Sequence, residues 1–136
     1  MKTIIQQRIS ALRESMKHFG LGAYIIPSSD PHLSEYPADC WKSRQWISGF
    51  TGSAGTVVVT ADKAGLWTDS RYFLQASKEL EGSGIELYKA GLPETPGIAA
   101  FLLRNLNENE TVGLDGQTYS VADAVELNSV LKKKKI

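Results

Sequence analysis

The sequence has little of what small secreted or metal-stabilised domains depend on. It contains one cysteine, Cys40, and two histidines among 136 residues. A single cysteine excludes an intrachain disulfide framework and favours a reducing compartment, so we expect a cytoplasmic protein. A chain of this length can bury about two thirds of the surface that it exposes when unfolded, which is enough for one domain with an apolar core.

Two further absences narrow the class of protein. Fifteen basic residues balance fifteen acidic ones. Nucleic-acid-binding domains are usually strongly basic, so we expect no nucleic-acid partner. No apolar run approaches the roughly 18 residues of a membrane helix, and residues 1–8 lack the apolar core of a signal peptide. We therefore expect neither secretion nor a membrane partner.

Apolar residues at helical spacing predict a first helix over residues 4–19, with a capping box formed by Thr3 and Gln6. A short helical turn is expected within residues 41–50. Three more helices are expected from their start residues: one capped by Asp69 or Ser70, one with Pro96 at its first position, and one opened by Ser120 and Asp123. This last helix would run through Val121, Val125 and Leu131 and end in Lys132–Lys135.

Short apolar runs predict about five strands, at residues 23–26, 56–60, 65–68, 85–88 and 111–114. The second and third are separated by a tight turn and should form an antiparallel hairpin. The first is apolar at nearly every position, which is typical of a strand buried on both faces. Strands and helices that alternate in this way predict a single α/β domain with a mixed β-sheet flanked by helices.

Three stretches invite a chemical interpretation that their details do not favour. Residues 49–56 contain three glycines, but this loop precedes a strand and lacks the motifs of a phosphate-binding loop. The polar loop 28–39 offers metal ligands without the spacing of a known metal motif. Cys40 and His32 could form a thiol nucleophile and its base only if the fold brought them into contact. A tight loop, a solvated histidine and a buried thiol are the favoured interpretations.

The junction formed by Asp69, Ser70, Arg71 and Tyr72 follows a predicted strand and precedes a predicted helix. Arg71 could hold the junction together through a buried ion pair with a carboxylate such as Asp69, or it could contact a ligand with its planar donors. Both alternatives remain open at this point. The residues alone provide no complete catalytic set.

Three segments nevertheless resemble a known family when they are taken together and in order. They are residues 23–36, AYIIPSSDPHLSEY, residues 48–56, SGFTGSAGT, and residues 67–76, WTDSRYFLQA. This combination is similar to the N-terminal domain of Xaa-Pro aminopeptidase, or aminopeptidase P, of the long cytosolic type. The similarity extends over essentially the whole chain.

The resemblance implies the creatinase-type N-terminal fold, which is not catalytic. In that family a C-terminal pita-bread domain holds two divalent metal ions, commonly manganese, and hydrolyses the bond between an N-terminal residue and proline. We expect that domain to be absent from residues 1–136, the accessory domain to be truncated at its C-terminal end, and the chain alone to be inactive. The implied partners are its own catalytic domain, a second copy in a full-length homodimer, and short proline-containing peptides.

The resemblance also implies which residues face the substrate cleft or a neighbouring domain, although it places no catalytic or metal-binding residue in this chain. The candidates are Asp30, His32, Glu35, Tyr36, Asp69, Arg71 and Tyr72. The sequence departs from the family at Ser70, where glycine is usual; a positive φ would be costly for serine.

Two other functions are compatible with the same residues. The chain could be the binding module of a catalytically inactive peptidase-like protein, in which the metal ligands of the partner domain are substituted. It could also be a free-standing ligand-binding α/β domain, whose melting temperature a small anion would raise.

Overall fold

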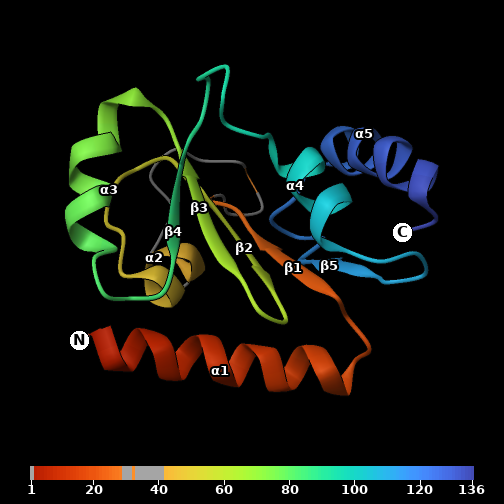
Figure 1. The fold of residues 1–136 in the computed structure, drawn as a ribbon, viewed down its shortest axis with the longest axis horizontal. Helices are drawn as coiled ribbons and strands as arrows, with labels where there is room; N and C mark the ends of the chain where they lie inside the picture. The colour runs from red at the N-terminus through yellow and green to blue at the C-terminus, as the bar shows by residue number, and fades with distance from the viewer. Residues whose placement is uncertain (1, 29–31, 33–41) are drawn as a thin grey trace.

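The computed structural model describes residues 2–28, 32 and 42–136, and its centre is a five-stranded mixed sheet (Figure 1). The strand order is β4-β3-β2-β1-β5. The strands are β1 (Ala23–Ile26), β2 (Thr56–Thr60), β3 (Ala64–Thr68), β4 (Glu86–Lys89) and β5 (Val112–Leu114). The predicted α/β class, the mixed sheet and the hairpin are confirmed. β2 pairs antiparallel with both β1 and β3, whereas β5 pairs parallel with β1 and β4 pairs parallel with β3.

The central strands are buried on both faces, as the apolar run at residues 23–26 predicts. Along β2, Val57 and Val59 belong to one apolar cluster and Val58 to another. Along β1, Ile26 and Ile25 are divided in the same way. Side chains alternate between the two faces of a strand, so each face of this sheet has its own core.

Helices cover both faces (Figure 1). One face packs against α1 (Lys2–His18), α2 (Ser43–Ser48) and α3 (Phe73–Glu79), and the other against α4 (Ile98–Asn105) and α5 (Val121–Leu131). Two short 3-10 helices, η2 (Ser70–Tyr72) and η3 (Lys132–Lys134), precede α3 and follow α5. No helix in the described part of the chain is long and apolar enough to cross a membrane.

Two predicted helix starts are wrong, although the helices themselves are present. The first helix begins at Lys2, so Thr3 lies inside it rather than at its cap. The helix expected from Pro96 begins at Ile98 with Gly97 at the N-cap, and the Pro96 carbonyl accepts a hydrogen bond from the Trp67 indole at 2.9 Å. Packing against the sheet selected a different start from local propensity.

The last helix is present, and only part of its apolar sequence is buried. Ser120 caps α5 as expected, by accepting a hydrogen bond from the Asp123 amide. Val121 and Val125 are 80% and 63% exposed, however, whereas Leu131 is buried and Leu127 packs beside it. The cause is that α5 turns the Leu127 and Leu131 side of its surface toward α4 and the sheet.

The strand directions determine which loops lie together. Because β1, β3, β4 and β5 run the same way and β2 runs opposite, the carboxyl ends of four strands and the start of β2 share one end of the sheet. The residues after β1, the loop before β2 and the junction after β3 therefore meet at this end.

Candidate functional site

A buried arginine shapes the loop that leads into β2. Arg44, on α2, donates hydrogen bonds to the carbonyls of Phe50 at 3.0 Å and Gly52 at 2.5 Å. Its guanidinium also lies over the Phe50 ring, 5.0 Å from the centroid. Burial lowers the pKa of Arg44, and nearby Glu79 and Tyr72 oppose that shift. The guanidinium therefore replaces the hydrogen bonds that these loop carbonyls would otherwise make to water.

The same loop begins where α2 ends, and a glycine is required there. Gly49 has φ 75°, in the left-handed region, and its amide bonds back to the Gln45 carbonyl. A residue with a side chain would be strained in this conformation. Farther along, the Thr51 amide donates to the Glu79 carboxylate of α3 at 3.0 Å. The loop is thus attached to α2 through Arg44 and Gly49 and to α3 through the Thr51–Glu79 hydrogen bond.

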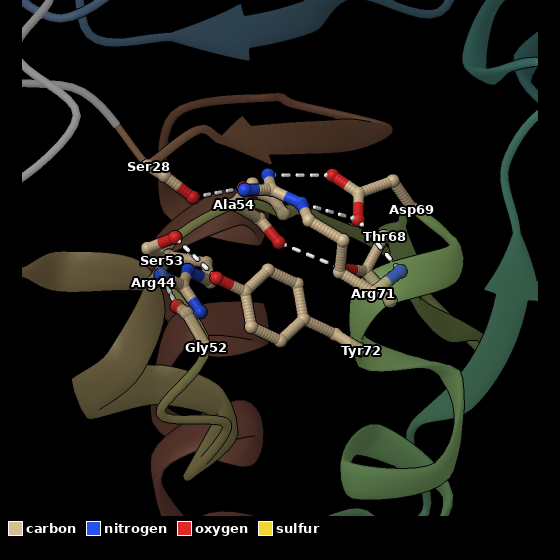
Figure 2. Close-up of polar contacts among 10 residues, drawn as sticks. Ser28, Arg44, Gly52, Ser53, Ala54, Thr68, Asp69, Arg71 and Tyr72 are labelled. Carbon is tan, nitrogen blue, oxygen red and sulfur yellow. Dashed lines mark hydrogen bonds and ion pairs between the residues drawn. The ribbon is translucent and has the colours of Figure 1, made fainter.

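Two hydrogen bonds made by hydroxyl groups join this loop to the strand β3 and to the turn that follows it. Ser53 and Tyr72 are hydrogen-bonded with 2.5 Å between their oxygens, and Thr68 donates to the Ala54 carbonyl at 2.7 Å. The Tyr72 ring also contacts Phe50 edge to face. Figure 2 shows the loop and the junction facing one another through the Ser53–Tyr72 and Thr68–Ala54 hydrogen bonds.

An ion pair lies at the junction itself. The Asp69 carboxylate receives two hydrogen bonds from the Arg71 guanidinium, at 3.0 and 2.9 Å, and a third from the Arg71 amide. The side-chain hydrogen bonds from Arg71 are the main reason why the pKa of Asp69 is lowered; desolvation opposes this shift, and the Arg71 amide and positive charge add to it. The two side chains remain 43% and 57% exposed, so the pair is a surface feature rather than the buried pair considered from the sequence.

Ser28, the residue after β1 and Pro27, completes the cluster. Its hydroxyl donates to the Gly55 carbonyl, and its side chain points toward the Arg71 guanidinium in Figure 2. We name Ser28, Ser53, Asp69, Arg71 and Tyr72 the junction site. It presents a planar cation, a carboxylate and three hydroxyl groups at one end of the sheet.

The structure brings together three of the seven candidate residues, namely Asp69, Arg71 and Tyr72. His32 is exposed. The remaining candidates, Asp30, Glu35 and Tyr36, lie outside the described residues, as does Cys40. Ser70 begins η2 without the positive φ that would strain it, and Asp69 is the residue that caps the turn.

Sequence reasoning missed Arg44, Ser28 and Ser53. A lone arginine in a short helix and a serine in a glycine-rich loop have no distinguishing pattern.

The described residues do not fit a metal centre. Among residues 2–28, 32 and 42–136 no group of three or more histidine, cysteine, aspartate or glutamate side chains could hold a metal ion. The junction site has one carboxylate, which Arg71 already occupies. It is suited to contact with polar or charged groups of a ligand or a neighbouring domain.

Comparison with known proteins places this arrangement in a family. The sequence model of the Creatinase/Prolidase N-terminal domain matches residues 8–136. Aminopeptidase P2 of Arabidopsis thaliana is 47% identical over 135 residues, which are 98% of this chain and 19% of that protein. Xaa-Pro aminopeptidase 1 of Dictyostelium discoideum is 46% identical over 99% of this chain and 21% of its own.

A solved structure agrees with this assignment. X-prolyl aminopeptidase from Caenorhabditis elegans, described as a cytosolic enzyme with a di-nuclear active site, has a TM-score of 0.87 and 31% identity, over 99% of this chain and 23% of its own. The chain spans about a fifth of the length of the curated relatives it matches. It therefore belongs to the Creatinase/Prolidase N-terminal domain family and matches the N-terminal domain of Xaa-Pro aminopeptidases.

Proposed function

We propose that this chain serves as the accessory N-terminal domain of a metal-dependent Xaa-Pro aminopeptidase, which removes the residue preceding proline from the N-terminus of a peptide. The observation that carries the proposal is the extent of the similarity: relatives with this activity in their names match nearly the whole chain at 45 to 47% identity. These names favour the peptidase over an inactive binding module.

The division of labour follows from the residues at hand. The reaction needs an activated water, which two metal ions, manganese in this proposal, supply when they are bound by the catalytic domain. The described residues contribute no such ligand cluster. Their proposed role is to contact the catalytic domain or a second subunit, and to narrow the substrate cleft so that short peptides are preferred.

Within this role we assign the contact surface to the junction site. Arg71 is exposed, and the Asp69 carboxylate orients its planar guanidinium. The backbone next to Arg71 is held in place because the neighbouring Tyr72 is hydrogen-bonded to Ser53. A cation oriented in advance loses less conformational freedom when it binds a carbonyl or carboxylate. His32, Asp30, Glu35 and Tyr36 remain predictions for the same surface.

The test is the Arg71→Ala variant of the full-length protein. We expect lower kcat/KM for short Xaa-Pro peptides with metal content unchanged, because the change removes a substrate-side or domain-side contact and no metal ligand. Lys78→Ala, which removes an exposed cation from α3 outside the junction site, is the matched control. Unchanged kinetics with a lower melting temperature would assign Arg71 a structural role and contradict the proposal.

Three further properties belong to this proposal. The 136-residue chain alone should not hydrolyse Xaa-Pro peptides, the full-length protein should form a homodimer, and it should reside in the cytoplasm. Peptide hydrolysis by the purified chain would contradict the first. Sedimentation of the full-length protein as a monomer would contradict the second.

A further inference from the structure

A pocket of about 360 Å³ lies beside the junction site, between the sheet and the helices α1 and α2. Its lining is mainly apolar and includes Leu12, Ile26, Pro27 and Ile47. The polar or amphipathic side chains that also line it include Arg8, Tyr24, Trp46 and Asp115. Its volume lies at the lower end of the range for small-molecule sites, about 300 to 1,000 Å³.

The pocket exists because the sheet is shorter on one side. The last register pair between β1 and β5 is Ile25 with Leu114, whereas β1 continues to Ile26 and pairs there with Val57 of β2. The chain turns away from the sheet at Asp115, where the Gln117 amide donates to the Asp115 carboxylate at 2.9 Å. No strand of the described residues therefore covers the β5 side of Ile26, and an apolar floor is left open.

Arg8 supplies an oriented cation at this floor. One of its terminal nitrogens donates to the Trp46 carbonyl at 2.7 Å, and the guanidinium carbon lies 4.4 Å from the centroid of the Trp46 ring. No ion pair links Arg8 to a carboxylate within the described part of the chain. A guanidinium has five N–H donors, so most of its capacity to bind a carboxylate is still available.

Trp46 extends the apolar surface outward. Its side chain is 56% exposed although it is one of the largest apolar groups in the chain. An indole that is stacked against a cation and open on its other side can pack against an apolar ligand group next to the cation. Apolar contact and positive charge are therefore adjacent at this position.

Asp115 and Tyr24 place a negative charge and a hydroxyl group on another part of the pocket lining. Burial raises the pKa of the Tyr24 hydroxyl, and the negative charge of Asp115 raises it further. Both groups are thus near one another on the β1 and β5 side of the pocket, while Arg8 and Trp46 come from α1 and α2. An anionic ligand group is repelled by Asp115 and attracted by Arg8, which leaves one favoured orientation.

We propose that this pocket binds an apolar group of about the size of an amino-acid side chain that carries a carboxylate. The apolar part occupies the floor formed by Leu12, Ile26 and Ile47, and the carboxylate pairs with Arg8 beside Trp46. An N-acyl amino acid and the C-terminal residue of a peptide share this chemistry. The proposal concerns binding by this domain and does not depend on peptidase activity.

The experiment is a titration of the 15N-labelled chain followed by two-dimensional NMR, with the Trp46 indole N–H as the reporter. The probes are N-acetyl-leucine, N-acetyl-leucinamide, and the peptide Ala-Ala-Ala-Leu with a free or an amidated C-terminus. We expect saturable shifts of Trp46 with both carboxylates and affinity about tenfold lower for both amides. Tighter binding of the free peptide would identify a C-terminal residue as the source, and equal binding would identify the small acid.

Two variants test the assigned residues. Arg8→Gln should weaken N-acetyl-leucine about tenfold, while Lys17→Gln, which removes an exposed cation from the same helix, should leave it unchanged. Arg8→Gln also removes the contact between Arg8 and Trp46, so Ala11→Phe provides a second test. Ala11 lines the pocket and is exposed, so a phenylalanine side chain should occupy the pocket in place of N-acetyl-leucine without disturbing the core.

The proposal is overturned if the amides bind as tightly as the acids, if Arg8→Gln binds like the original chain, or if no probe shifts Trp46. These outcomes would leave the proposed peptidase role unaffected, since they involve neither Arg71 nor hydrolysis. Conversely, a failure of the Arg71→Ala test would leave the pocket proposal intact.

Discussion

The hydroxyl oxygens of Ser53 and Tyr72 lie 2.5 Å apart and connect the loop before β2 with the turn after β3. This contact joins two segments that flank the same end of the sheet. It holds Tyr72 in place, and the neighbouring Arg71 guanidinium lies 5.0 Å from the centroid of the Tyr72 ring. The orientation of the exposed cation therefore depends on a hydrogen bond that is partly buried beneath it.

Removal of this hydrogen bond should destabilise the domain. We expect Tyr72→Phe to lower the free energy of unfolding by about 1 kcal/mol, because the ring still contacts Phe50 while the Ser53 hydroxyl loses its partner. Urea denaturation measures the change. If the hydroxyl pair is the cause, Ser53→Ala combined with Tyr72→Phe should cost less than the sum of the single changes. Additive costs would show that the two hydroxyls do not interact.

Loss of the buried arginine should cost more. Arg44→Met removes the donors to the Phe50 and Gly52 carbonyls, which leaves two loop acceptors without their partner. We expect a loss of about 2 to 4 kcal/mol in the free energy of unfolding. Arg104→Met, at an exposed position on α4, is the control and should change stability by less than about 0.5 kcal/mol. Similar effects of both changes would contradict the clamping role of Arg44.

The contribution of Asp69 should disappear in acid. Hydrogen bonds from Arg71 lower its pKa in the folded state, so the stabilisation is present above the unfolded-state pKa of about 3.9 and is lost as the pH falls through the lower folded value. The pair is largely exposed, so the effect should stay below about 1 kcal/mol.

Asp69→Asn isolates this charge because asparagine still caps the turn. The stability difference between the two chains should be constant at neutral pH and shrink toward zero in acid, when measured by thermal unfolding across a pH series. A difference that persists unchanged in acid would show that something other than the carboxylate charge is responsible.

A methyl group at Gly65 should disturb the apolar core on the α4 and α5 face of the sheet, which contains Trp67. A Cβ there would lie 2.6 Å from a Tyr88 ring carbon and 2.8 Å from a Trp67 ring carbon, and these two rings are stacked with centroids 4.2 Å apart. We expect Gly65→Ala to cost about 1 to 3 kcal/mol. Gly116→Ala is the matched control, since nothing lies within 4 Å of its added Cβ. The near-UV circular dichroism of the stacked rings should change only in the Gly65 variant.

The repeated apolar spacing was sufficient to predict most of the fold. Residues 23–26 and 56–60 are apolar or β-branched at nearly every position, which is typical of strands whose side chains are buried on both faces of a sheet. A cap at Asp69 or Ser70 and a cap at Ser120 were predicted because a short polar side chain before a helical pattern favours that use, and the structure selects Asp69 for the first. Helix bounds at Pro96 and Thr3 were not predicted, since tertiary packing overrode the local preference.

The sequence by itself determined the class of fold, the junction residues Asp69, Arg71 and Tyr72, and the family resemblance, because these depend on local pattern and order along the chain. Only the tertiary structure decided that Ser28, Arg44 and Ser53 join them, and that Arg8, Trp46 and Asp115 line one pocket. Those partners come from segments far apart in sequence. Their proximity follows from strand direction and register, which no local pattern encodes.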